Sequence, residues 1–212
     1  MAINYRVAAD VVDIRTDAPR SSDVFLVDTN VWFWMTYSRA GSGDRPPRHY
    51  QVTDYPLFVR QALAAHANIH RCELSLPELA SLVEKTELAI YSAATGFDRS
   101  VPNALKIYRH NEIAERSNVV GEIQSAWSLL TTMAKAVSFV VDETLGAGTI
   151  GCCSNCQLDA YDAMMVGAAS QCNISQIITD DGDYCTIPGI TVFTANRSVI
   201  GAANLANRLV VR

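Results

Sequence analysis

The fold of this chain is decided by residues 24–34, which read VFLVDTNVWFW. Residues 24–27 are all apolar and do not alternate with polar residues, which predicts a strand buried on both faces. Asp28, Thr29 and Asn30 follow at once, and we expect a helix from about residue 31 to 37. In open α/β sheets, ligands bind at the carboxyl ends of the strands, where Asp28 would lie. Asp28 is therefore the first candidate for chemistry, and a helix N-cap is the alternative interpretation.

The rest of the chain alternates between strand-like and helix-like segments. We expect further strands at residues 69–74, 137–141, 174–179 and 190–193. We expect helices at residues 56–67, from 75 onward, and at 103–117, 119–135 and 158–171, with loops at 38–54 and 143–157. Residues 4–14 fit a short strand or an arm. This alternation predicts a three-layer α/β/α sandwich with a mainly parallel central sheet and a helical insertion.

The bulk composition restricts the kind of protein this can be. The chain has 212 residues and a formal net charge of −5, which fits one domain with insertions and argues against nucleic-acid binding by bulk charge. Any such binding would need a local basic patch or bridging metal ions. The sequence shows neither a long apolar run nor a secretory signal, so we expect a cytoplasmic protein without a membrane span and with mostly reduced cysteines.

Two further acids are expected at helix starts. Glu78 lies three residues after Ser75, so it is either the acid of a capping box or a site residue. Glu84 and Glu87 share this helix and are expected to face solvent. Asp162 opens a helix rich in Ala and Gly, and Asp159 lies one turn earlier. We expect Asp159 to be the cap or an outer residue of the site, and we expect Asp162 to belong to the site itself.

A fourth acidic position follows the strand expected at 174–179. Asp180, Asp181 and Asp183 crowd this strand end, and carboxylates so close together need a counter-charge. An acidic turn held open by Gly182 is the alternative. Considered with Asp28, Glu78 and Asp162, the segment favours a site for Mg²⁺ or Mn²⁺, which take oxygen ligands.

The cysteines offer a competing metal site. Cys152, Cys153 and Cys156 provide one C-x-x-C pair with a neighbour, whereas structural zinc normally requires four ligands. The histidines at 66, 70 and 110 show no ligand spacing. The three tryptophans are expected in the core or at an interface. Zinc is therefore the weaker of the two metal interpretations.

Three segments resemble the motifs of PIN-domain nucleases. VFLVDTNVW is similar to the opening motif, LSLPELASLVEK to the second, and YDAMMVGAASQCNISQIITDDGDYCTIPGITVF to the closing block. The resemblance covers about residues 24–37, 69–92 and 137–194. The family's four acids fall on Asp28, Glu78, Asp162 and Asp181. The supporting positions fall on Asn30, on Thr179 of the T-x-D motif, and on the trailing acid Asp183.

This resemblance implies metal-dependent hydrolysis of RNA phosphodiester bonds by a metal-activated water, without a covalent intermediate. Asp28, Asp162 and Asp181 would hold one or two Mg²⁺ or Mn²⁺ ions, and Glu78 would complete the site or orient the water. Basic residues near the groove are candidates for gripping the RNA backbone. These are Arg39, Arg45, Arg48 and Arg99.

The chain is larger than compact members of the family. The expected organisation is an N-terminal arm at 1–23, a nuclease domain at 24–195 with insertions at 38–54 and 97–135, and a C-terminal segment at 196–212. Small members are often toxins of toxin–antitoxin pairs, which makes an antitoxin protein and a homodimer candidate partners. The added segments weigh against the toxin role.

Two alternatives to a nuclease remain. One is a non-catalytic PIN-like scaffold that binds RNA or protein, against which the presence of all four acids argues. The other is an aspartyl-phosphate phosphatase with Asp28 as the nucleophile. Such enzymes require an acid two residues after the nucleophile, where this chain has Asn30.

Overall fold

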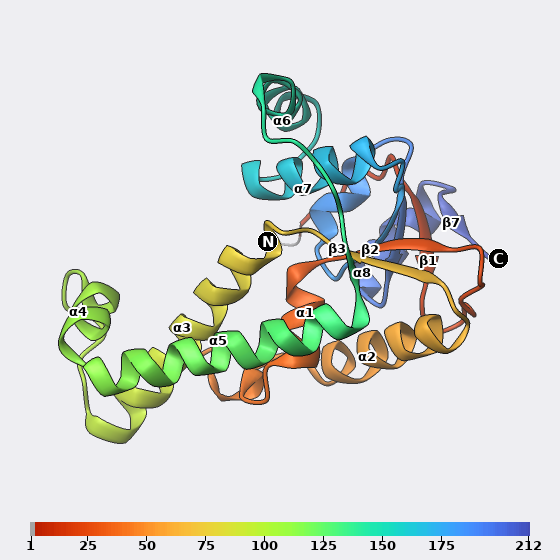
Figure 1. The fold of residues 1–212 in the computed structure, drawn as a ribbon. Helices are drawn as coiled ribbons and strands as arrows, with labels where there is room; N and C mark the ends of the chain where they lie inside the picture. The colour runs from red at the N-terminus through yellow and green to blue at the C-terminus, as the bar shows by residue number, and fades with distance from the viewer. Residues whose placement is uncertain (1–2) are drawn as a thin grey trace.

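The computed structural model describes residues 3–212 and shows an α/β protein built on one seven-stranded, all-parallel sheet (Figure 1). The strands are β1 (Asp10–Asp13), β2 (Val24–Val27), β3 (Asn68–Arg71), β4 (Lys135–Ala136), β5 (Gln176–Ile178), β6 (Thr191–Thr194) and β7 (Leu209–Val210). They lie in the order β4-β3-β2-β5-β6-β1-β7. Together with helices on both faces, this order confirms the expected three-layer α/β/α sandwich.

Eight α-helices and two short 3₁₀ turns connect the strands in the described part of the chain. They are α1 (Thr29–Thr36), η1 (Ala40–Ser42), α2 (His49–Ala64), α3 (Ser75–Thr95), α4 (Ala104–Asn111), α5 (Ile113–Met133), α6 (Glu143–Asn155), α7 (Ala160–Gln171), η2 (Gly182–Thr186) and α8 (Arg197–Leu205). Among these residues no helix is both long and apolar enough to cross a membrane.

The central strands send successive side chains to opposite faces of the sheet, which explains their unbroken apolar sequence. In β2, Phe25 and Val27 belong to one buried cluster and Leu26 to another. The side chains of the neighbouring strand β5 are distributed in the same way, with Ile178 in the first cluster and Ile177 in the second. Both faces of the sheet are therefore covered, and the site at its edge stands on a rigid support.

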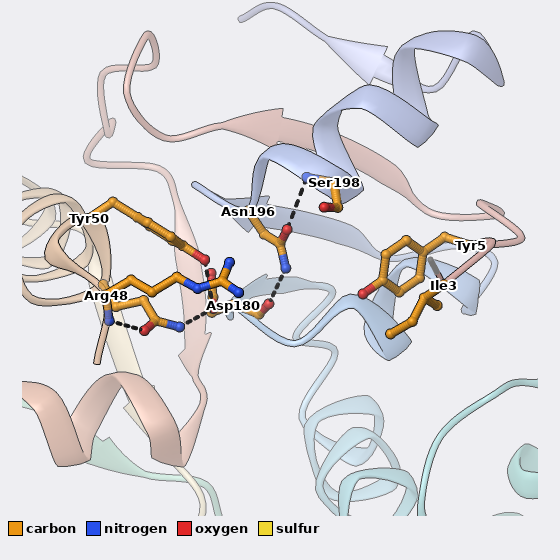
Figure 2. A pocket seen from close by; sticks show the side chains of 8 residues that line it. Ile3, Tyr5, Arg48, Tyr50, Asp180, Asn196 and Ser198 are labelled. Atoms are coloured by element: carbon orange, nitrogen blue, oxygen red, sulfur yellow. Dashed lines mark hydrogen bonds between the residues drawn. The ribbon is translucent and has the colours of Figure 1, made fainter. Parts of the chain in front are cut away.

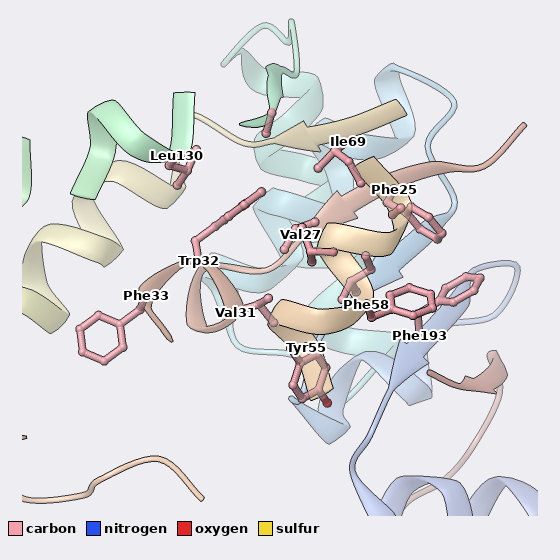
Figure 3. Close-up of a cluster of buried hydrophobic side chains, with 14 of the residues drawn as sticks. Phe25, Val27, Val31, Trp32, Phe33, Tyr55, Phe58, Ile69, Leu130 and Phe193 are labelled. Atoms are coloured by element: carbon pink, nitrogen blue, oxygen red, sulfur yellow. The ribbon is translucent and has the colours of Figure 1, made fainter. Parts of the chain in front are cut away.

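The first cluster lies beneath α1, α2, α3 and α5 (Figure 3). Phe25 packs edge-on against Phe193 of β6 and against Phe58 of α2, with ring centroids 4.9 and 5.9 Å apart. Such aromatic pairs add to the stability given by burial alone. Trp32 is fully buried there, and Trp34 and Trp127 pack against the cluster, which confirms the expected role of the tryptophans.

The second cluster lies on the other face, beneath α7 and α8. Helix α6 does not reach the sheet and packs on α7 instead (Figure 1). A Cβ atom at Gly167 would lie 2.7 Å from the Leu145 side chain, so glycine at this position allows the two helices to approach closely. Leu145 is the one apolar residue of α6 that is fully buried.

Helices α3 and α5 run side by side away from the sheet and carry α4 at their far end (Figure 1). We call α4, α5 and the C-terminal two-thirds of α3 the helical arm. Its small apolar cluster consists of Leu88, Tyr108 and Val119. Glu84 and Glu87 lie in this arm and are buried, so the expectation that they face solvent is wrong. Their arginine partners come from segments distant in the sequence and could not be foreseen from α3 alone.

Several expected boundaries require correction. Residues 143–157 were expected to be a loop, but they contain α6, whose N-cap Asp142 accepts a hydrogen bond from the Leu145 amide at 2.9 Å. Residues 137–141 were expected to be a strand, but the strand lies at Lys135–Ala136. The region 38–54 is not entirely a loop, because α2 begins at His49. Residues 10–13 are β1, which pairs with β6 inside the sheet.

Candidate active site

Four of the expected acids come from elements that meet at the carboxyl edge of the sheet. The chain leaves β2 toward β3 on one side, whereas it leaves β5 toward β6 on the other, so β2 and β5 flank a topological switch point. Such points are where open α/β sheets bind ligands. Asp28 directly follows β2 and Asp181 follows β5 by three residues, while Glu78 and Asp162 lie in the first turns of α3 and α7.

Asp28 is buried, with 2 % of its surface exposed. Its backbone continues the strand pairing, since its N–H donates to the Ile178 carbonyl at 3.0 Å. Asp28 holds the N-cap position of α1 but its side chain makes no capping hydrogen bond, so the capping interpretation is wrong. The carboxylate instead accepts a hydrogen bond from the Thr179 hydroxyl at 2.8 Å.

The electrostatic surroundings of Asp28 are unfavourable to its charge. Burial raises its pKa well above the ordinary value, and the negative charges of Asp162, Glu78 and Asp181 raise it further. The Thr179 hydrogen bond acts in the opposite direction but is weaker than burial. A carboxylate held under these conditions is a functional-site candidate, because structural ion pairs would lower its pKa instead.

Glu78 is half-buried and also lacks the structural role that its sequence allowed. Leu74 occupies the N-cap of α3, no capping box forms, and the Ser75 hydroxyl is buried without a partner. Glu78 Oε2 likewise has no hydrogen-bond partner among the described residues. Burial, Asp159 and Asp181 raise the pKa of Glu78, whereas Lys85 has a smaller opposing effect.

Thr29 connects Glu78 to the start of α1. Its hydroxyl lies near enough to Glu78 to be, after burial, the second-largest influence on the pKa of that carboxyl, which it lowers, yet Thr29 Oγ1 completes no hydrogen bond among the described residues. Glu78 Oε2 is unsatisfied too, so neither atom uses its hydrogen-bonding capacity within the described part of the chain. A buried acceptor and a buried hydroxyl without partners are unusual in native proteins.

Asp162 lies on α7, whose cap is Asp159. The Asp159 carboxylate accepts hydrogen bonds from the amides of Tyr161 and Asp162 at 2.8 and 2.9 Å, which confirms that Asp159 is the cap of this helix. Asp162 itself accepts a hydrogen bond from the Tyr184 hydroxyl at 2.9 Å. Burial raises the pKa of Asp162 to about 7, partly offset by this hydrogen bond and increased by Asp159 and Asp181.

Asp181 is joined to Asp28 through Thr179. The Asp181 amide donates to Thr179 Oγ1 at 2.9 Å, and the same hydroxyl donates to Asp28 at 2.8 Å. The Asp181 carboxylate accepts a hydrogen bond from the Asp183 amide at 2.8 Å, which fixes its rotamer. Burial is the main reason for the raised pKa of both Asp181 and Asp183.

Asp180 differs from its neighbours and supports the structure. Its carboxylate accepts hydrogen bonds from the Tyr50 hydroxyl at 3.1 Å, the Tyr55 hydroxyl at 2.8 Å and the Gln51 amide at 2.5 Å. These donors all belong to α2, so Asp180 ties that helix to the end of β5. Tyr184 is the other residue of this segment with a role that the sequence analysis did not foresee.

The remaining expected residues are dispersed. Asn30 is half-buried in the first turn of α1. Arg39 forms ion pairs with Glu87 and Glu122 at 2.7 and 2.9 Å, so it supports the helical arm. Arg45 is exposed, and Arg48 lines a cavity beside Asp180. Arg99 pairs with Asp44.

The donor set fits a hard divalent cation, because it consists of carboxylate oxygens that lack a compensating positive charge. Glu78 Oε2, buried and unpartnered, is the structural feature that supports this most directly. Within residues 3–212, however, no group of three or more His, Cys, Asp or Glu side chains is positioned to hold a metal ion as it stands. The acids thus act on one another electrostatically without converging on a single point.

The cysteine cluster lies elsewhere. All six cysteines are free, and Cys152 and Cys153 lie on the last turns of α6, which Cys156 caps. This helix packs on α7 and does not contribute to the carboxyl edge of the sheet.

No protein-family model and no curated protein matches the chain.

Proposed function

We propose that the protein is a metal-dependent endoribonuclease that hydrolyses RNA phosphodiester bonds at the four acids Asp28, Glu78, Asp162 and Asp181. The observation that carries this proposal is the burial of Asp28 beside three other carboxylates, all of which raise its pKa. Mg²⁺ or Mn²⁺ would supply the missing positive charge. The resemblance of three segments to PIN-domain motifs supports RNA as the substrate.

Each of the residues at the site would have a separate role in the reaction. Asp28, Asp162 and Asp181 would hold the cation, which when bound acidifies water and neutralises charge on the phosphoryl group. Thr179 holds the carboxylate of Asp28 and the backbone of Asp181 in a fixed relation. Tyr184 fixes the rotamer of Asp162. Glu78 keeps one oxygen free of protein partners, and this oxygen would orient the attacking water.

Charge neutralisation at Asp28 tests this proposal. The substitution Asp28→Asn preserves the shape of the side chain and its ability to accept the Thr179 hydrogen bond, but removes the negative charge. We expect Mg²⁺- or Mn²⁺-dependent cleavage of a labelled RNA pool to fall by at least about 100-fold, the scale on which removal of one electrostatic catalytic group acts. Circular dichroism would show that the variant is folded.

Glu84→Gln is the matched control, because it neutralises a buried carboxylate of the helical arm. This variant should cleave RNA at the wild-type rate. Equal cleavage by wild type and Asp28→Asn would refute the assignment of the site. Absence of cleavage by the wild type with both cations and with varied RNA would refute the enzymatic proposal and favour a scaffold. The role as a toxin with an antitoxin partner stays a prediction.

A further inference from the structure

A polar cavity of about 420 Å³ lies beside Asp180, the residue that precedes Asp181. It is lined by Ile3, Tyr5, Arg48, Tyr50, Gln51, Asp180, Asn196 and Ser198 (Figure 2). Asp180 is adjacent in sequence to Asp181, so the cavity and the candidate active site share the segment that follows β5. The cavity is large enough for a small ligand, since ligand pockets typically have volumes of about 300–1,000 Å³.

Tyr5 lines this cavity on the side of the loop that carries Asp181 and Asp183. Its ring lies directly on Gly182, where a Cβ atom would be only 2.3 Å from two of the ring carbons. Only glycine therefore allows the ring to lie against this loop. Asp181 and Asp183 both add to the raised pKa of the Tyr5 hydroxyl, after the larger effect of burial, which places the ring beside the acidic loop. In Figure 2 the Tyr5 ring stands across the cavity from Arg48 and Tyr50.

The opposite wall of the cavity carries the positively charged side chain of Arg48. Arg48 is exposed and does not take part in the ion pairs found among residues 3–212. Its side chain makes no capping hydrogen bond to α2, although the residue holds the N-cap position. The guanidinium lies beside the Tyr50 hydroxyl, whose pKa it lowers, but its charge is not neutralised by a carboxylate in the described ion pairs. Guanidinium groups bind phosphate well.

The floor of the cavity offers one acceptor. Asp180 Oδ2 accepts hydrogen bonds from Tyr50 and Gln51, whereas Oδ1 accepts only that of Tyr55. A carboxylate oxygen can accept two hydrogen bonds, so Oδ1 retains capacity. Asn196 donates one N–H of its side-chain amide to the Asp180 carbonyl, and its Oδ1 accepts a hydrogen bond from the Ser198 backbone N–H. The floor thus presents a carboxylate acceptor together with the second N–H of Asn196.

We infer that this cavity binds one nucleotide of the RNA next to the scissile phosphate, and that it prefers a base with an exocyclic amine. The base would stack on Tyr5, its amine would donate to Asp180, and its phosphate would contact Arg48. Carboxylates accept hydrogen bonds from the cytosine amine, whereas uracil has no such amine. This inference rests on the proposed nuclease function for its placement beside the cleavage site.

The test is binding of free nucleotides in EDTA, so that neither cleavage nor a cation is involved. NMR titration of the full-length protein with cytidine and uridine 5′-monophosphate compares two ligands that differ at the position facing Asp180. We expect cytidine monophosphate to bind more tightly. Tyr5→Ala should weaken its binding about tenfold, the scale of one base–aromatic stack, whereas Tyr5→Phe should retain it.

Arg48→Ala should weaken binding of the monophosphate but not of cytidine, whereas Arg60→Ala, at an exposed arginine of α2 outside the cavity, should change neither. Equal binding of the two nucleotides, or wild-type binding by Tyr5→Ala, would overturn the inference.

Cleavage assays separate this inference from the proposed function. If RNA is cleaved and Tyr5→Ala leaves both the rate and the base preference unchanged, the nucleotide cavity is refuted and the nuclease stands. If cytidine monophosphate binds as expected but no RNA is cleaved, the cavity stands as a nucleotide site and the nuclease is refuted. Binding of oligonucleotides but not of free nucleotides would also overturn the cavity as the recognition site.

Discussion

The candidate active site and the helical arm both bury carboxylates, but they treat the charge in opposite ways. In the arm, Glu84 lies between Arg109 and Arg116, with N–O distances of 2.5 and 3.1 Å. The hydrogen bond and charge of Arg109 lower the pKa of Glu84, and this effect exceeds that of burial. Glu87 is likewise paired, with Arg39 at 2.7 Å and with the Tyr37 hydroxyl.

At the carboxyl edge of the sheet, burial is the largest influence on the pKa of the acids, and it raises that pKa. Asp28, Asp162 and Asp181 receive hydroxyl or amide hydrogen bonds but no ion pair among the described residues, and the pKa of each is raised. A paired buried acid is compatible with a purely structural role, whereas several buried acids that raise one another's pKa cost stability when they are charged. This contrast is the basis of the proposal that a cation binds among the acids of the carboxyl edge.

The strongest test of this contrast is the pH dependence of stability in EDTA. The folded-state pKa of Asp162 is about 7, above its ordinary value of 3.8. Between these values the folded protein binds more protons than the unfolded chain, so the contribution of Asp162 to stability is present below about pH 4 and is lost as the pH rises toward 7. We expect a loss of the order of a few kcal/mol in the free energy of unfolding, measured by urea denaturation.

The variant Asp162→Asn isolates this contribution, because it removes the titrating group without changing its size. The difference between wild type and variant should grow in favour of the variant as the pH rises from 4 to 7. A difference that is constant over this range would show that Asp162 is an ordinary exposed acid, and the contrast with the arm would then be lost.

Divalent cations provide the next test, with a smaller effect. A cation bound at the site would stabilise the folded state by about 2.7 kcal/mol when its concentration is 100 times the dissociation constant. At pH 7.5 we therefore expect Mn²⁺ to raise the Tm by about 5–10 °C, given the usual sensitivity for a chain of this length. The measurement is differential scanning calorimetry with and without Mn²⁺.

Asp28→Asn should abolish most of this increase, whereas Glu84→Gln should keep it, since Glu84 lies in the arm. An equal increase of the Tm in both variants would mean that Mn²⁺ binds elsewhere, and the interpretation of the unpaired acids would fail.

The sequence alone was sufficient for the sandwich and for the placement of the acids, because both depend on local signals. The unbroken apolar run 24–27 followed by Asp28 identifies a central strand and its carboxyl end. The carboxyl ends of parallel strands meet at one edge, so Asp181 could be expected there too. Whether these four acids form a cleavage site remains a prediction.

What the sequence did not indicate depends on long-range contacts. Helix α6 has a Gly- and Thr-rich sequence with weak helix propensity, and its formation depends on packing of Leu145 against Gly167 of α7. The burial of Glu84 depends on arginines 25 and 32 residues away. The role of Tyr5 depends on a loop more than 170 residues later in the chain. Periodicity within a segment cannot report such partners.

The smallest expected effect concerns the arm itself. Glu84→Gln removes the ion pairs with Arg109 and Arg116, whose side chains are each 42 % exposed, so solvent already screens the interaction. We expect a loss of about 1 kcal/mol in the free energy of unfolding at pH 7, measured by urea denaturation.

Because the pKa of Glu84 is lowered, its contribution is present above the ordinary value of 4.5 and disappears as the pH falls through the folded-state pKa. The loss caused by Glu84→Gln should therefore shrink on acidification, whereas the gain caused by Asp162→Asn grows as the pH rises. Opposite slopes for two buried acids of one protein would establish that the arm uses its carboxylates for stability and that the carboxyl edge does not.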